Sequence, residues 1–220
     1  MFVDVVMLAD SKSPELISMT QRAIDTLHSS ETDHEFIAVV VESNKNVHLY
    51  NNANILTPNF EFNYHWYMKY GLQHLSEGGL SDFVCLANND LIFHKNWFTE
   101  IVKASEDMPL VKSFSSFNPS SLWIHDNKYH IGYGVGGVVT GWCLTMKKEI
   151  LDVIDLSEDV NFWCSDNVYN DELIKHGIQH ALVRDSHVTH LGGATLFTLN
   201  SERISELTSG QVEIYHKRGK

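Results

Sequence analysis

Residues 3–44 read VDVVMLADSKSPELISMTQRAIDTLHSSETDHEFIAVVVESN, and this stretch decides the fold class. Its first part, residues 3–8, is apolar and rich in β-branched side chains with little alternation, which is typical of a strand buried on both faces. Ser13-Pro14-Glu15 has the order of an N-cap, a first-turn proline and a first-turn acid, and apolar residues follow at helical spacing. A second β-branched run closes the stretch. This order of strand, helix and strand predicts a parallel sheet with right-handed crossovers.

The rest of the chain continues the alternation of strands and helices. Further strands are expected at residues 83–87, 110–114, 138–146 and 179–183. Further helices are expected at residues 63–75, 96–108, 147–154 and 166–176, the last of them capped by Ser165. The predicted fold is a single α/β domain over residues 1–197 with a mostly parallel central sheet. A C-terminal helix over residues 198–220 is expected to pack on this domain.

Composition places the chain among ordinary globular proteins. It has 220 residues, of which 43% are hydrophobic and 20% charged. No apolar run approaches the roughly 20 residues that span a bilayer. The N-terminal residues Met1-Phe2-Val3-Asp4 lack the basic region of a secretion signal, so we expect a cytoplasmic protein. Three cysteines without a C-x-x-C pair argue against a zinc cluster and against a disulfide framework.

The charge balance bears on the partners. The formal net charge is -12, from 28 acidic against 16 basic residues. Binding along a phosphate backbone needs clustered Lys and Arg side chains, so an extended nucleic-acid surface is disfavoured. A protein with a negative net charge can still carry a local cluster of positive charge. Five lysines are candidates for such a cluster: Lys45, Lys69, Lys95, Lys112 and Lys128.

Polar side chains follow three of the predicted strands. Ligands of open α/β sheets bind beyond the carboxyl ends of the strands. A single carboxylate at such a position more often caps a helix or lies in a solvated turn than binds a ligand. Three polar segments that follow successive parallel strands, however, converge on one crevice. The sequence therefore predicts a ligand site there. Its segments are Ala9-Asp10-Ser11, Glu42-Ser43-Asn44 and Asn88-Asn89-Asp90.

The order of several short motifs is distinctive. A strand ends in the acid Glu42, a later one ends in Asn88-Asn89-Asp90, and Trp97 opens the next helix. The later motifs are Gly141-Trp142-Cys143 before a basic helix, the aromatic loop Asn161-Phe162-Trp163-Cys164-Ser165-Asp166, and His190-Leu191-Gly192-Gly193. Over nearly the whole chain this order resembles the GT-A glycosyltransferases, particularly the large inverting family 2. The acidic motif departs from the D-x-D pattern, because Asn88 replaces its first acid.

The resemblance implies a fold and an activity. It implies one Rossmann-like GT-A domain, of the nucleotide-diphospho-sugar transferase type. It also implies transfer of a sugar from a nucleotide-sugar donor, most simply a UDP-sugar, to an acceptor hydroxyl. Glu42 would hold the nucleoside. The residues expected on the donor side are Ala9, Asp10, Ser11, Glu42, Asn63, Asn88 and Asn89.

The resemblance further implies a metal site at Asp90 and His190, for Mn²⁺ or Mg²⁺. A divalent ion bridging two phosphates neutralises the charge that builds on a diphosphate leaving group. Hard cations prefer oxygen ligands, and Mn²⁺ also accepts imidazole. His187 forms H-x-x-H with His190. Positions three apart on a strand point to opposite faces, so both histidines cannot readily bind one ion there, whereas a turn would allow both to bind. The resemblance favours His190, because it implies a ligand directly before the Gly-Gly turn.

Inverting transfer needs a base beside the acceptor hydroxyl, and Asp166 is the candidate. An acid in the first turn of a helix is also favoured by the helix dipole, which is the competing explanation. Trp142 and Trp163 are expected on the acceptor side.

Two rival functions stand beside this one. A non-catalytic nucleotide-sugar-binding module is compatible with the altered acidic motif. A nucleotidyltransferase is disfavoured, because residues 9–12 supply no Gly-rich basic loop. Residues 132–137 match G-x-G-x-x-G, but a strand-like segment follows them, so we interpret them as a loop near the acceptor side rather than a dinucleotide site.

For the acceptor a saccharide is expected first, and a hydroxymethylated DNA base is the alternative.

Overall fold

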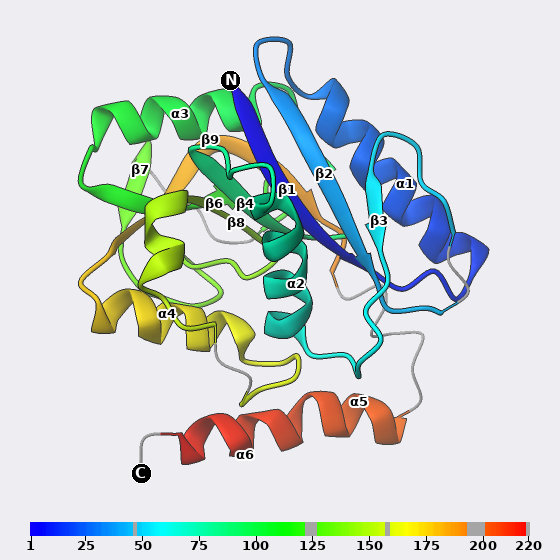
Figure 1. Ribbon diagram of the computed structural model, residues 1–220. Helices are drawn as coiled ribbons and strands as arrows, with labels where there is room; N and C mark the ends of the chain where they lie inside the picture. Colours follow the sequence, from blue (N-terminus) through cyan, green and yellow to red (C-terminus); the bar gives the residue numbers. More distant parts are fainter. Residues whose placement is uncertain (46–47, 122–126, 157–158, 193–200, 219–220) are drawn as a thin grey trace.

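A computed structural model describes residues 1–45, 48–121, 127–156, 159–192 and 201–218 (Figure 1). Its strands are β1 (Phe2–Ala9), β2 (Glu35–Glu42), β3 (Asn54–Leu56), β4 (Phe83–Asn88), β5 (Leu91–Phe93), β6 (Val111–Phe117), β7 (Tyr129–Ile131), β8 (Cys143–Lys147) and β9 (Gln179–His190). Its helices are α1 (Pro14–Ser29), α2 (Tyr64–Ser76), α3 (Trp97–Asp107), the 3₁₀ helix η1 (Lys148–Asp152), α4 (Ser165–Lys175), α5 (Ser201–Leu207) and α6 (Ser209–Lys217).

One nine-stranded sheet organises the chain, in the order β3-β2-β1-β4-β8-β6-β9-β5 with β7 beside β9. β1 is parallel to β2 and β4, β2 is parallel to β3, and β6 is parallel to β9. β8 lies antiparallel between β4 and β6, and β5 and β7 are antiparallel to β9. Most strands therefore share one direction, which confirms the predicted α/β class with a mostly parallel sheet.

The first strand-helix-strand unit forms as its sequence predicts. The Ser13 side chain accepts a hydrogen bond from the Leu16 amide at 3.3 Å and caps α1. Alternate residues of β1 enter the two halves of the core. Val5 packs with α1 and α3 on one face of the sheet, and Val6 packs with α2 and α4 on the other. This burial on both faces explains the continuous apolar run.

α2 approaches the sheet closely at Gly71. A Cβ added there would lie 2.5 Å from Cγ1 of Val6, so the helix could not keep its position with a larger residue. This contact sets the height of α2 over β1 and β2, and with it the position of Tyr64 at the start of the helix (Figure 1).

Several predicted boundaries are corrected. The strand expected at residues 138–146 begins only at Cys143, because the residues before it form a turn closed by a hydrogen bond from the Cys143 amide to the Thr140 carbonyl. Ser165 is the first residue of α4 rather than its cap, because Cys164 takes the cap position in the left-handed conformation with φ of 67°. The strand expected at residues 179–183 continues to His190, because β6 pairs with it at His187 and β5 pairs with residues 188–190. The H-x-x-H segment is consequently a strand and not a turn.

A long-range cap holds the start of α3. The Glu31 carboxylate accepts hydrogen bonds from the Phe98 amide at 2.7 Å, from the Thr99 amide at 2.9 Å and from the Thr99 hydroxyl at 2.7 Å. Glu31 and its bond from the Phe98 amide are buried, so removing the carboxylate leaves that donor without a partner, whereas the two Thr99 donors are partly buried.

Glu31→Ala is therefore expected to lower the free energy of unfolding by about 1–3 kcal/mol, as measured by urea denaturation. Glu35→Ala is the matched control, because Glu35 is exposed, and it should change stability by less than about 0.5 kcal/mol. Equal effects of the two substitutions would contradict the capping role.

The C-terminal segment comprises two helices, α5 and α6, rather than the one expected (Figure 1). Val212 and Tyr215 of α6 pack against a small cluster formed by Val160, Cys164 and Val168. The Tyr215 hydroxyl also donates to the Asp171 carboxylate of α4 at 2.9 Å. The domain boundary predicted at residue 197 lies outside the described residues and stays a prediction. None of the helices within the described ranges has the length and apolar character that crossing a bilayer needs.

Candidate active site

The polar ends of β1, β2 and β4 lie side by side. Ala9 pairs with Glu42, and Leu8 pairs with Asn88, so the segments that follow these strands leave the sheet at one edge. The Asn88 amide also donates to the carbonyl of Trp142 at 2.9 Å, which brings the segment before β8 to the same edge. The predicted convergence of the first three segments is therefore observed.

Glu42 organises the loops at this edge. One of its oxygens accepts hydrogen bonds from the Ser11 amide at 3.0 Å and the Asn44 amide at 2.8 Å, and the other accepts from the Tyr50 hydroxyl at 3.2 Å. Burial, aided by the charge of Glu42, raises the pKa of Tyr50 to about 12, so this hydroxyl stays a donor. The buried Glu42 carboxylate thus fixes the loop after β1 against the loop after β2.

Two other residues of the predicted donor side have different surroundings. Asp10 pairs with Lys12 at 2.8 Å near the surface. The Ala9 carbonyl accepts from both the amide and the hydroxyl of Ser43, at 2.9 and 3.0 Å. The Ala9 contact is a backbone contact, so it shapes the crevice rather than supplying a recognition group.

Asn88 and Asn89 diverge at the end of β4. The Asn89 side-chain amide is buried and donates to the Thr20 hydroxyl of α1 at 2.9 Å. Asn88 is partly exposed beside the Trp142 carbonyl. Of these two residues predicted to contact the nucleotide-sugar donor, Asn88 has the more accessible side chain.

The side chain of Asn63 caps a helix and joins two segments of the chain. Its side-chain oxygen caps α2 through the Trp66 amide at 3.1 Å, and its side-chain nitrogen donates to the Val160 carbonyl and to Asn161, at 3.2 and 3.1 Å. The side chain is engaged on both sides, so the structure gives no support to the predicted ligand contact.

Asp90 and His190 meet at the same edge. β5 pairs with β9 so that Leu91 lies opposite His190, and the Leu191 amide donates to the Asp90 carbonyl at 2.9 Å. His190 Nε2 lies 3.3 Å from Asp90 Oδ1. Trp142 stacks on the His190 ring with centroids 5.4 Å apart and an interplanar angle of 16°. His190, at the end of β9, therefore contacts both Asp90 and the segment before β8.

The Asp90–His190 pair fits a divalent cation. Asp90 is 4% exposed, and its Oδ1 atom makes no well-aligned hydrogen bond in the part of the chain that the structure describes, although His190 Nε2 lies 3.3 Å away. A buried carboxylate oxygen with only this contact is unfavourable unless the imidazole is protonated or a cation lies between the two groups. Within the described ranges no third acidic, histidine or cysteine side chain completes a metal cluster. A pair of protein ligands suits an ion that keeps waters and binds substrate phosphates at its other positions.

His187 lies apart from this pair. It is exposed on β9, and its ring lies 6.1 Å from that of Phe117 and 6.5 Å from that of His94. Strand geometry directs residues three apart to opposite faces. The alternative in which both histidines bind one ion therefore loses its structural basis.

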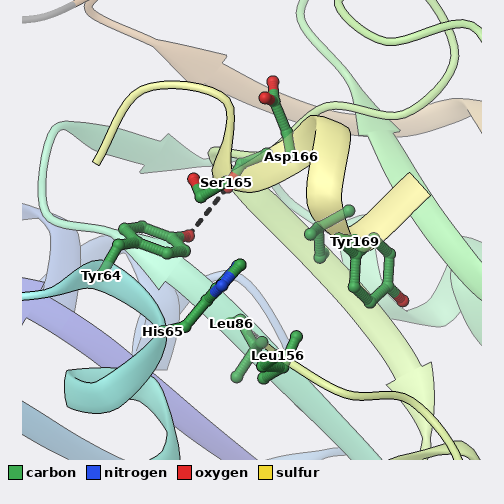
Figure 2. Close-up of a pocket in the computed structure, with 9 residues that line it drawn as sticks. Tyr64, His65, Leu86, Leu156, Ser165, Asp166 and Tyr169 are labelled. Atoms are coloured by element: carbon green, nitrogen blue, oxygen red, sulfur yellow. Dashed lines mark hydrogen bonds between the residues drawn. The ribbon is translucent and has the colours of Figure 1, made fainter. Parts of the chain in front are cut away.

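Asp166 lies in the first turn of α4, against Gly141. Its carboxylate accepts from the Asn167 amide at 2.9 Å, and desolvation by burial raises its pKa. The Tyr64 hydroxyl donates to the Gly141 carbonyl at 3.0 Å on the other side of that residue. Figure 2 shows this hydrogen bond, and it shows the Asp166 carboxylate directed away from Tyr64 and His65. A raised pKa and a defined direction suit a proton acceptor.

The cavity below Asp166 is small. Its volume of about 10 Å³ is enough for one water molecule, and Tyr64, His65 and Tyr169 are among its lining residues. A sugar ring does not fit there. A substrate of Asp166 must therefore approach from the side to which its carboxylate points.

The two candidate acceptor-side tryptophans occupy different positions. Trp142 is partly buried against His190, whereas Trp163 is 46% exposed just before α4. Trp163 lies beside Phe162, with ring centroids 6.5 Å apart and an interplanar angle of 46°. Trp142 thus belongs to the metal side of the site, and Trp163 belongs to the surface near Asp166.

Gly141 allows Asp166 to reach its place. A Cβ on Gly141 would lie 2.6 Å from Cβ of Asp166, so an alanine must displace the start of α4. Gly141→Ala is expected to lower any activity that depends on Asp166 by at least about tenfold, since displacement by about 1 Å can cost about 10²-fold. Gly78→Ala is the control, because its nearest neighbour would be a carbonyl oxygen at 3.7 Å. Steady-state rates of the two variants test this, and an unimpaired Gly141→Ala would contradict the close contact.

Sequence reasoning missed several residues of this region. Tyr50, Thr20 and Tyr64 contact predicted site residues through side chains that no motif marks. The glycine at position 141 was noted only as part of a motif. Residues 132–137 form a loop after β7 with no helix following, as predicted. Gly193 of the His-x-Gly-Gly motif lies outside the described residues.

Comparison with known proteins defines the class of fold. No family model matches the chain, and no curated protein matches it. Solved structures do match it, and they show that the chain has the GT-A fold, as predicted.

Two of these structures illustrate the similarity. A crystal structure of GalNAc-T7 with UDP, GalNAc and Mn²⁺ is 12% identical with a TM-score of 0.65, over 86% of this chain and 44% of that one. The mannosyltransferase PcManGT from Pyrobaculum calidifontis, in complex with GDP-Man and Mn²⁺, is 14% identical with a TM-score of 0.61, over 86% of this chain and 56% of that one. The chain thus spans about half the length of these two proteins.

Proposed function

We propose that this protein is a glycosyltransferase that moves a sugar from a nucleotide-sugar donor to an acceptor hydroxyl with the help of a divalent cation. The observation that carries the proposal is the contact of Asp90 with His190 at the carboxyl edge of the sheet, where His190 Nε2 lies 3.3 Å from the buried Asp90 Oδ1 atom without forming a well-aligned hydrogen bond. The GT-A fold adds support, because both similar structures described above contain Mn²⁺ and a nucleotide or nucleotide sugar.

Each part of the edge has a role in this proposal. The loops fixed by Glu42, which include Asp10 and Ser11, hold the nucleoside, and Asn88 lies between them and the metal pair. Asp90 and His190 hold Mn²⁺ or Mg²⁺, which when bound neutralises charge on the diphosphate leaving group. The segment Gly141-Trp142 separates the metal pair from Asp166.

Asp166 is proposed as the base that takes the proton from the acceptor hydroxyl. Its raised pKa keeps it a better proton acceptor than an exposed aspartate. A base acting directly on the acceptor corresponds to attack opposite the leaving group, so we propose inversion at the anomeric carbon.

A saccharide is the proposed acceptor, ahead of modified DNA. The lysines considered for a DNA-binding cluster are largely paired with acids: Lys69 with Asp155, Lys112 with Glu149, and Lys128 with Asp107. Such pairing, with the net charge of -12, leaves little positive surface for a phosphate backbone.

The first experiment measures release of nucleoside diphosphate from a panel of UDP- and GDP-sugars with and without Mn²⁺. We expect Mn²⁺-dependent hydrolysis of at least one donor, with a UDP-sugar the first candidate. A non-catalytic binding module is the competing function, and the altered motif at Asn88 is the feature that favours it. Donor binding without hydrolysis or transfer, measured with the same panel, would establish the binding module instead.

A further inference from the structure

A buried histidine that has no part in the proposed reaction lies between β6 and β9. His180, on β9, is fully buried, and both nitrogens of its ring contact hydroxyl groups of β6. Nδ1 lies 2.6 Å from the Ser113 hydroxyl, and Nε2 lies 3.0 Å from the Ser115 hydroxyl. Nε2 also lies 3.2 Å from the carbonyl of Val138, in the loop before β8. Both polar atoms of the imidazole are therefore satisfied inside the protein.

The Val138 carbonyl fixes the direction of these hydrogen bonds. A carbonyl oxygen can only accept, so His180 Nε2 carries the proton and Nδ1 has a free lone pair. The Ser113 hydroxyl consequently donates to Nδ1, and it accepts from the Tyr169 hydroxyl at 2.7 Å. Burial lowers the pKa of His180 to about 4, so the ring is neutral at physiological pH and keeps this arrangement.

One end of this chain of hydrogen bonds reaches the helix that carries Asp166. Tyr169 lies one turn after Asp166 on α4, and Figure 2 shows both side chains on the same helix. Tyr169 is buried, so its hydroxyl depends on partners within the protein, and Ser113 is the nearer of the two that it has, the other being the sulfur of Met146. The bond between Tyr169 and Ser113 therefore ties the first turns of α4 to β6.

The other end of the chain reaches Gly141. The Ser115 hydroxyl contacts His180 and also accepts from the Thr140 amide at 3.0 Å. Thr140 directly precedes Gly141, the residue whose added Cβ would lie 2.6 Å from Cβ of Asp166. His180 thus connects the two sides of this contact, the loop on one side and α4 on the other.

We propose that His180 is a positioning residue for Asp166, which holds α4 and the loop before Gly141 in a fixed relation through hydroxyl groups on either side of its ring. The inference rests on the proposed function for the role of Asp166 as a base, whereas the positioning itself needs no substrate. Such positioning matters for catalysis because a displacement of about 1 Å can cost about 10²-fold in rate.

The test removes one hydroxyl group on each side of the imidazole, by Ser113→Ala and by Ser115→Ala. Both substitutions keep the buried ring, whereas replacement of His180 itself empties part of the core and risks unfolding the protein. The pKa of Asp166 is measured by NMR titration of its carboxyl carbon without donor or acceptor, and the signal missing from Asp166→Asn identifies it.

Both serine variants are expected to lower the pKa of Asp166. Burial raises this pKa in wild type, and a carboxylate that moves away from Gly141 gains water. The fall toward the ordinary value near 3.9 should reach at least about 0.5 pKa unit, which is about threefold in the acid constant.

The double variant tests whether the two serines act through His180. Ser115 bonds to the loop and to His180, and Ser113 bonds to His180 and to α4. Since one break already separates the two ends, the double variant should lower the pKa of Asp166 by less than the sum of the single changes. Additive changes would mean that the serines act independently, and they would overturn the role of His180.

Ser116→Ala is the matched control. Ser116 lies on the same strand and is equally buried, but its hydroxyl bonds to that of Ser186 at 2.8 Å. Its replacement also removes one buried hydrogen bond, so it should lower stability to a similar extent. It should leave the pKa of Asp166 unchanged, which separates positioning from a general loss of stability.

Transfer kinetics give the second measurement. With saturating donor, Ser113→Ala and Ser115→Ala should each reduce kcat at least about tenfold, because Asp166 is displaced. KM for the donor should stay within about twofold of wild type, since the proposed donor contacts lie elsewhere. Ser116→Ala should transfer at the wild-type rate.

The outcomes separate this inference from the proposed function. An Asp166 pKa that is unchanged in both serine variants, or that falls equally in Ser116→Ala, would overturn the positioning role even if wild type transfers sugar. A lowered pKa in the two variants of a protein that neither hydrolyses a donor nor transfers sugar would support the positioning and reject the proposed function.

Discussion

Asp166→Asn is expected to slow sugar transfer by about 10²–10⁴-fold, the range that a general base contributes. Asparagine keeps the side-chain oxygen that accepts from the Asn167 amide, so the start of α4 should keep its geometry. The asparagine side chain cannot, however, take a proton from the acceptor hydroxyl. Donor affinity should stay unchanged, because the proposed donor contacts lie at Glu42, Asp90 and His190. Initial rates with saturating donor measure the effect.

The same substitution, Asp166→Asn, is expected to slow transfer without lowering the stability of the folded protein. Desolvation raises the pKa of Asp166 in the folded protein, so the folded state favours the neutral carboxyl group. Wild-type stability therefore falls as the pH rises from the unfolded-state pKa, near 3.9, through the raised folded-state pKa. Asp166→Asn escapes this penalty and should be at least as stable as wild type at pH 7. Thermal unfolding between pH 4 and pH 7 tests the sign.

Asp171→Asn is the matched control for the base. Asp171 is on the same helix but exposed, where its carboxylate accepts a hydrogen bond from Tyr215. Its replacement should leave the transfer rate within about twofold of wild type. A normal rate for Asp166→Asn, or an equal loss in both variants, would contradict the assignment of Asp166 as the base.

Asp90→Asn is expected to reduce Mn²⁺-dependent turnover by on the order of 10³-fold, because metal stabilisation of a leaving group contributes several kcal/mol. The variant keeps the shape of the side chain and removes the charge that pairs with the ion. Asp82→Asn serves as the control, because Asp82 pairs with Lys148 at the surface, at 3.2 Å. Turnover that is insensitive to Mn²⁺ in wild type, or full activity of Asp90→Asn, would contradict the metal role.

The sequence was most informative where structure depends on local signals. The N-cap at Ser13 and the buried run of β1 were predicted because neighbouring residues determine them. The Ser165 cap was wrong because Cys164 adopts a positive φ, which no side-chain pattern indicates for a cysteine. The separate helices α5 and α6 were likewise not visible in the polar C-terminal pattern.

For the site, the sequence predicted which strand ends carry polar groups but not how their side chains are engaged. Proximity of Asp90 and His190 depends on the pairing of β5 with β9, two segments nearly one hundred residues apart, and it was expected only through the resemblance. Engagement of the Asn63 side-chain nitrogen by Val160 and Asn161 also depends on contacts between distant segments, and so does that of Glu42 by the Ser11 amide.

The most direct test of the central claim is pulsed electron paramagnetic resonance of Mn²⁺ bound with UDP, with GDP as the second nucleotide. We expect coupling of the ion to an imidazole nitrogen in wild type and in His187→Ala, because His187 lies away from Asp90. The coupling should disappear in His190→Ala. Coupling that survives in His190→Ala, or that is absent from wild type with either nucleotide bound, would contradict a metal site formed by Asp90 and His190.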